Sequence, residues 1–487
     1  MTEPDSPQPL TLIEALIPVA SLILLIGLSY HLFGDAGASG PNQVALVVAT
    51  MIAVFIAWRR GHTMEALGKA ASDGVSAGIG AIFILLAVGA LIGAWALSGT
   101  LVAMVYYGLQ LLNPDYFYAT AAVICAVISI SIGSSWTVVG TIGIGLMGIS
   151  LDMGLNPAIT AAAVISGAYF GDTISPLSDS ANLAAAAAGV NLYHHLRATA
   201  VTSLLALLVA LVVFWLLGQR GDPAGADHEM AAIYGTFHIS LVLFLPLVLV
   251  IVLALLRLPP FSTIFIGALV GGVLAVLVAP DRVAAFVDAA GAMPRWLALV
   301  KAVWLAIASG YVLTTGDPAL DHLVSRGGMA SMLNTIWLVI AALAFGGVVE
   351  RAGVLDRLMA PIIAAATSVG GLVTALVGAV IVTNVVAADQ YIAIVLPGRM
   401  FKGAFAKREI PPVVLSRTVG ASGTPTSALV PWNSCGAYMA ATLGVATFSY
   451  LPYAVFSFIS PVLAIAFAYA GFQIRRGPGT AEQPIAN

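Results

Sequence analysis

Three aspartates, Asp172, Asp179 and Asp389, lie inside long stretches that carry no lysine or arginine and are largely apolar. Most other acids lie in polar loops or at the ends of apolar stretches. A carboxylate at the centre of a membrane-spanning helix costs about 2.5–3.5 kcal/mol on insertion scales, so we expect each of the three to have a cation or a proton as its partner. Ion binding and proton transfer are therefore the chemistry to look for.

The first cluster is the stretch 170–182, which reads FGDTISPLSDSAN. Gly171 and Pro176 break helices, and a broken helix frees backbone carbonyls. Carboxylate, amide, hydroxyl and carbonyl oxygens together are the ligands that a hard cation takes. The predicted ligands are listed in chain order: Asp172, Ser175, Ser178, Asp179 and Asn182. The alternative is a short polar loop at the membrane surface.

The second cluster combines the same oxygen ligands with Gly and Pro interruptions. Its predicted members are Thr383, Asn384, Asp389, Ser422, Thr424 and Asn433. We expect this cluster to face the first one. In the alternative interpretation, Asp389 pairs with Arg399 or Arg417 and is structural.

The elements that carry these clusters are predicted from composition. Of 487 residues, 60% are hydrophobic and 8% are charged, against about 25% charged in soluble proteins. Apolar runs near 20 residues, the length that crosses a bilayer, recur along the chain. The sequence therefore predicts an all-α polytopic membrane protein with about 10–13 transmembrane helices, surrounded by lipid. It excludes a soluble enzyme and a disordered chain, and a net charge of −3 offers no basic face for nucleic acid.

The polar stretch 219–234 divides the chain into membrane halves 1–218 and 235–474, followed by a tail, 475–487. Lysine and arginine concentrate in cytoplasmic loops. Their positions here predict cytoplasmic termini and an extracytoplasmic linker, so one half is inverted relative to the other. Four short similarities recur about 250 residues apart, among them 171–177 with 423–429. Inverted repeats with broken or re-entrant helices are typical of secondary transporters.

The stretches 171–184, 383–401 and 415–445 resemble the NhaC-type sodium/proton antiporters, a family that includes malate/lactate antiporter relatives. The resemblance implies a proton-coupled sodium exchanger of the ion-transporter superfamily in a bacterial or archaeal plasma membrane, built as a homodimer. The oxygen ligands of the first cluster lead us to expect Na⁺ at Asp172, Asp179 and Asn182, and no cofactor besides the transported ions is expected. The chain differs from the family pattern at Gly420 and Ala421, where the family has two acids; it also has Thr173 in place of a basic residue.

Two alternatives to sodium/proton exchange follow from the residues. The first is sodium- or proton-coupled exchange of a small organic anion such as malate or lactate, because half-helix N-termini suit a carboxylate. The second, more remote, is an intramembrane protease, because residues 420–423 match GxSG. Such a protease needs a histidine on a later helix, and the last histidine is His322. We therefore expect a transporter and no enzyme; with no Walker A sequence in the chain, ion gradients would drive it.

Overall fold

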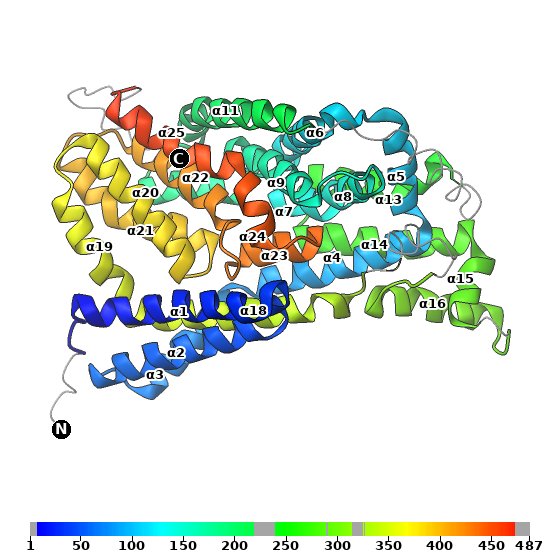
Figure 1. The fold of residues 1–487 in the computed structure, drawn as a ribbon, viewed down its shortest axis with the longest axis horizontal. Helices are drawn as coiled ribbons and strands as arrows, with labels where there is room; N and C mark the ends of the chain where they lie inside the picture. Colours follow the sequence, from blue (N-terminus) through cyan, green and yellow to red (C-terminus); the bar gives the residue numbers. More distant parts are fainter. Residues whose placement is uncertain (1–6, 219–238, 289–290, 314–324, 326, 473–487) are drawn as a thin grey trace, which may run out of the picture.

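The structure is a computed structural model that describes residues 7–218, 239–288, 291–313, 325 and 327–472 (Figure 1). These residues form helices joined by short connections. The first half contains α1 Leu12–Phe33, α2 Pro41–Arg59, α3 Met64–Ala77, α4 Ile79–Ser98, α5 Thr100–Leu111, α6 Phe117–Ile132, α7 Ser135–Val138, α8 Ile144–Asp152, α9 Pro157–Ile174, α10 Asp179–Ala188 and α11 Leu192–Leu216. The second half contains α13 Leu245–Leu255, α14 Pro260–Val278, α15 Pro280–Val287, α16 Arg295–Ser309, α18 Leu333–Arg351, α19 Val354–Ala365, α20 Val369–Val386, α21 Gln390–Ala406, α22 Pro412–Ser427, α23 Ser434–Leu443, α24 Thr447–Tyr450 and α25 Val455–Tyr469.

Nine helices of the described residues are long and apolar enough to cross a membrane, or up to ten when the bent pair formed by α24 and α25 counts as one span. The predicted all-α, multi-pass membrane fold is confirmed; nine spans fall just below the predicted range of about 10–13, and ten would meet its lower end. The remaining helices are shorter or carry more polar residues. The inverted relation of the two halves and the side of each terminus remain predictions.

The outer surface of these helices is apolar. Leu24, Leu277 and Trp304 each expose more than two thirds of their surface, which suits contact with lipid chains and not with water. The long apolar run 76–112 is divided between α4 and α5. Gly99 adopts a left-handed conformation (φ 87°) between α4 and α5, which a side chain rarely tolerates.

The two sequence halves pack into one body. Helices α9, α10 and α11 of the first half contact α21, α22 and α25 of the second, and α4 packs along α14. Figure 1 shows α1, α2 and α18 along one edge, where α2 contacts both α1 and α18. The predicted linker 219–234 and tail 475–487 lie outside the described residues.

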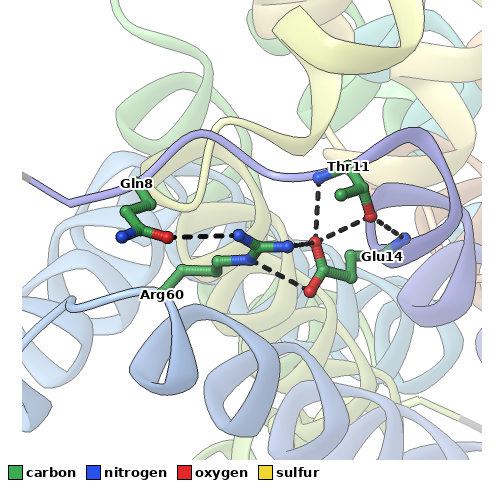
Figure 2. A network of polar contacts seen from close by, with 4 residues as sticks. All are labelled: Gln8, Thr11, Glu14 and Arg60. Carbon is green, nitrogen blue, oxygen red and sulfur yellow. Dashed lines mark hydrogen bonds and ion pairs between the residues drawn. The ribbon is translucent and has the colours of Figure 1, made fainter.

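The start of α1 is fixed to the end of α2 by a small polar network (Figure 2). Thr11 and Glu14 form a reciprocal capping box at the N-terminus of α1. Arg60 then donates two hydrogen bonds to the Glu14 carboxylate, from Nε at 3.0 Å and from Nη2 at 2.5 Å, and a third to Gln8. This bidentate pair holds two adjacent helix ends in register.

Candidate functional site

A cavity of about 630 Å³ is lined by both halves of the chain. Its charged lining residues are Asp172 and Asp179 from the first half, and Asp389 and Arg257 from the second. All three aspartates predicted from the sequence therefore line one space. Among the described residues, no three His, Cys, Asp or Glu side chains come close enough to hold a metal ion together. A small cation in the cavity would therefore not meet all three carboxylates at once, and neutral oxygens would complete its shell.

Asp172 is buried near the end of α9 and accepts hydrogen bonds from three serine hydroxyls. Ser135 Oγ donates to Oδ2 at 2.6 Å, whereas Ser178 Oγ and Ser180 Oγ donate to Oδ1 at 2.5 Å and 2.9 Å. These hydroxyls come from the start of α7, the N-cap of α10 and the first turn of α10. One carboxylate therefore joins three helix ends at a wall of the cavity. We call Asp172 and these three serines the carboxylate hub.

The break between α9 and α10 orients the other predicted residues of the first cluster. Ser178 caps α10 by accepting from the backbone N–H of Ala181 (3.2 Å), which leaves Asp179 exposed on the first turn and Asn182 one turn later. Both line the cavity. Ser175 does not: its Oγ donates to the Ile130 carbonyl at 2.7 Å and ties the break to α6.

The start of α7 contributes more than the sequence indicated. Ser135 and Ser180 were not among the predicted site residues, although both line the cavity and bind Asp172.

Gly133, in a left-handed conformation (φ 77°), allows the break before α7 to approach the break between α9 and α10. A Cβ at Gly133 would lie 2.6 Å from Leu177 Cβ and 2.9 Å from the Ser178 nitrogen. A π-helical turn, Val139–Gly143, follows α7. Such turns often occur at functional sites.

In the second half, Asp389 is the N-cap of α21. Its Oδ1 accepts from the backbone N–H groups of Tyr391 at 2.8 Å and Ile392 at 3.0 Å. The preceding Ala388 is left-handed (φ 56°), which is uncommon for a residue with a side chain and marks the break between α20 and α21. The carboxylate thus has a capping role and also lines the cavity.

The other predicted residues of the second cluster form a buried polar layer and do not line this cavity. Asn384 Nδ2 donates to the Gly423 carbonyl at 3.0 Å, and Asn433 Nδ2 donates to the Asn384 carbonyl at 3.0 Å. The hydroxyls of Thr383 and Ser422 donate to carbonyls one turn earlier in their own helices. The fifth member, Thr424, is also buried. The two amides therefore hold the broken helices together.

Helices α10 and α23 correspond closely. Each has ten residues, begins after a side-chain N-cap and ends at a left-handed glycine, Gly189 or Gly444. This correspondence pairs the caps Ser178 and Asn433, and it pairs Asp179 with Ser434, the first residues of the two helices, both of which line the cavity. The two halves therefore present equivalent helix starts to one space.

The GxSG stretch lies in α22. Ser422 Oγ donates to the Thr418 carbonyl at 2.5 Å. His195 packs against Gly420 from α11, yet its Nδ1 lies 3.2 Å from Ser416 Oγ, a different serine. His322, the last histidine of the sequence, falls outside the described residues. The geometry at Ser422 is that of a helix-internal hydrogen bond.

Comparison with known proteins places this site in a family. The model of the Na⁺/H⁺ antiporter family matches residues 11–219 and 167–472, which together span both halves. The chain belongs to this family. An antiporter family is a class of transporters and not a class of enzymes.

Relatives within the Na⁺/H⁺ antiporter family differ in cargo. The Na⁺/H⁺ antiporter NhaC of Alkalihalophilus pseudofirmus is 36% identical over 91% of this chain and 92% of its own. The malate-2H⁺/Na⁺-lactate antiporter of Bacillus subtilis is 34% identical over 95% of both chains. The arginine/ornithine antiporter ArcD of Halobacterium salinarum is 33% identical over 95% of this chain and 92% of its own. The predicted resemblance to NhaC-type antiporters and their malate/lactate relatives is confirmed.

Proposed function

We propose that the protein exchanges Na⁺ for H⁺ across the membrane by alternating access, with the cavity as its transport site. The observation that carries the proposal is the carboxylate hub at the wall of this cavity, within a chain of the Na⁺/H⁺ antiporter family. Hydroxyl and carboxylate oxygens suit both of the cargoes, a proton and a hard cation.

In this mechanism Asp172 is the shared binding group. When it is ionised, its two oxygens accept from three hydroxyls, and these hydroxyls also carry lone pairs that can turn toward a cation. When Asp172 takes up a proton instead, its attraction for Na⁺ is lost. Since one carboxylate cannot hold both cargoes, each passage between the two sides carries one or the other, and exchange follows.

Asp179 and Asn182 contribute oxygens nearer the opening of the cavity, where both side chains are exposed. Asp389 faces them from the second half. Ser175, Thr383, Asn384, Ser422, Thr424 and Asn433 support the breaks. In this proposal they position the helix ends and do not touch the cargo in the state described.

The test is transport by the purified protein in proteoliposomes that contain a pH-sensitive dye. A pulse of external Na⁺ should alkalinise the lumen when H⁺ leaves in exchange, or acidify it when the gradient is reversed. Replacing Na⁺ with choline should abolish the signal. A proton signal that is the same with every cation would refute sodium/proton exchange.

A second candidate is exchange of a small carboxylate, favoured by the 34% identical malate-2H⁺/Na⁺-lactate antiporter. The cavity of about 630 Å³ has room for a small organic anion, and Arg257 on its wall carries the required positive charge. Uptake of radiolabelled malate or lactate that Na⁺ accelerates, without Na⁺/H⁺ exchange in its absence, would favour this candidate over the first.

The arrangement in the membrane is part of the proposal. We place the protein in a bacterial or archaeal plasma membrane with cytoplasmic termini, supported by Arg59 and Arg60 after α2 and by the cluster of basic residues at 399–408. We also propose inverted repeats and a homodimer. Reporter fusions should place the C-terminus and the 219–234 linker on opposite sides of the membrane. Cross-linking in native membranes should yield a dimer.

A further inference from the structure

Arg257 lines the cavity from the connection between α13 and α14, and it is the one lysine or arginine among the described residues that do so. Its backbone is left-handed (φ 63°). Its N–H donates to the Ala254 carbonyl at 2.9 Å, and the following Leu258 N–H donates to the Leu253 carbonyl at 3.1 Å. Helices usually place glycine at this position, because a side chain is strained there. An arginine at a position that favours glycine, lining the same cavity as three aspartates, points to a role for its charge.

The three aspartates raise a problem of selectivity that a sodium transporter must solve. Carboxylate oxygens together with carbonyls and water are the usual ligands of Ca²⁺ and Mg²⁺. A cavity lined by Asp172, Asp179 and Asp389 attracts a divalent ion twice as strongly as a monovalent one, since Coulomb energy is proportional to the charge of the ion. A divalent ion that stayed in the cavity would block exchange.

We propose that Arg257 determines the valence selectivity of the cavity: its fixed positive charge weakens the binding of divalent cations more than that of Na⁺. The guanidinium stays charged at every physiological pH. Its repulsion is also proportional to the charge of the ion, so whatever factor it imposes on Na⁺ affinity, it imposes the square of that factor on Ca²⁺. This role rests on the proposed function, because it assumes that Na⁺ occupies this cavity.

The decisive variant is Arg257→Gly, because glycine suits the left-handed backbone and removes only the side chain. For a separation of about 10 Å and an effective dielectric constant of about 40, loss of one charge should lower the half-maximal Na⁺ concentration about 4-fold. The concentration of Ca²⁺ that half-inhibits exchange should then fall about 16-fold. Arg257→Lys keeps the charge and serves as the matched control, which should resemble the wild type in both values.

Each outcome is informative. The proposal would be overturned if Arg257→Gly changed the Na⁺ and Ca²⁺ values by equal factors or changed neither. It would also be overturned if Arg257→Lys, which keeps the charge, shifted both values as Arg257→Gly does. Both factors should shrink as ionic strength rises, because salt screens charges at an open cavity. Stabilisation of the purified variants by Ca²⁺ against heat measures divalent binding without transport. If wild-type protein shows no Na⁺/H⁺ exchange at all, the proposed function fails, whereas normal exchange with unchanged selectivity in Arg257→Gly refutes this inference alone.

Discussion

Replacing Asp172 with asparagine tests the centre of the proposed mechanism. Three hydroxyls donate to this carboxylate, and hydrogen bonds to a charged group contribute about 1.5–3 kcal/mol each. Their sum, about 4.5–9 kcal/mol, matches the several kcal/mol that desolvation of a buried ion costs. The hub can therefore hold an ionised carboxylate without a cation. Since asparagine loses both the charge and its desolvation cost, we expect Asp172→Asn to fold with a melting temperature near that of the wild type.

Transport should respond very differently. A unit charge about 4 Å from a bound cation contributes about 4 kcal/mol at an effective dielectric constant of about 20, so its loss lowers Na⁺ affinity about 10³-fold. In the dye-loaded proteoliposomes, Asp172→Asn should give no Na⁺-dependent proton signal at Na⁺ concentrations that saturate the wild type. Asp115→Asn, an exposed loop change outside the cavity lining, is the control and should exchange normally. A well-folded Asp172→Asn protein with wild-type Na⁺ dependence would refute the assignment of this carboxylate.

Further predictions concern the opening, the wall and the first break of the site. Asp179→Asn should raise the half-maximal Na⁺ concentration about 10-fold without changing the melting temperature, because this exposed carboxylate attracts the cation at a distance of about 5 Å through a more aqueous medium. An unchanged Na⁺ dependence would exclude a role for Asp179 in cation binding. Cys435 lines the cavity and Cys125 does not, so a small thiol reagent should label only Cys435, and Na⁺ should slow the labelling; equal labelling with and without Na⁺ would place cation binding elsewhere. Gly133→Ala should lower the free energy of unfolding by more than Gly353→Ala does. Both changes introduce about 1 kcal/mol of left-handed strain, but a Cβ at Gly353 meets no atom within 4 Å. Equal melting temperatures for the two variants would contradict the close approach of the two breaks.

The sequence predicted the membrane fold and the first cluster for a simple physical reason. A carboxylate in an apolar stretch is costly, so Asp172 and Asp179 could be identified without knowing their neighbours. The serine partners of Asp172 were harder to find, because a serine is common in membrane helices, and Ser135 lies 37 positions from the carboxylate that it binds.

The amides show where sequence reasoning ends. Asn384 and Asn433 have the oxygen that a cation ligand needs, but they also have the N–H donors that free carbonyls need. At a broken helix, an amide can therefore bind a cation through its oxygen or donate to a free carbonyl through its N–H groups, and only the fold determines which it does. Here Asn384 and Asn433 donate to carbonyls of the neighbouring break, whereas the equivalent N-cap in the first half, Ser178, donates to the carboxylate of Asp172.

The two halves fasten their breaks in different ways, and this difference bears on mutational tolerance. In the second half, the Ser434 N–H donates to the Ala388 carbonyl at 2.9 Å, a bond between backbone groups that almost any amino acid can supply. In the first half, the corresponding link passes through the side chains of Asp172 and Ser135 and exists only for those residue types. A saturation mutagenesis screen should therefore find position 172 intolerant of every other residue type, whereas at position 388 the bond should survive any residue that its buried, left-handed backbone accommodates.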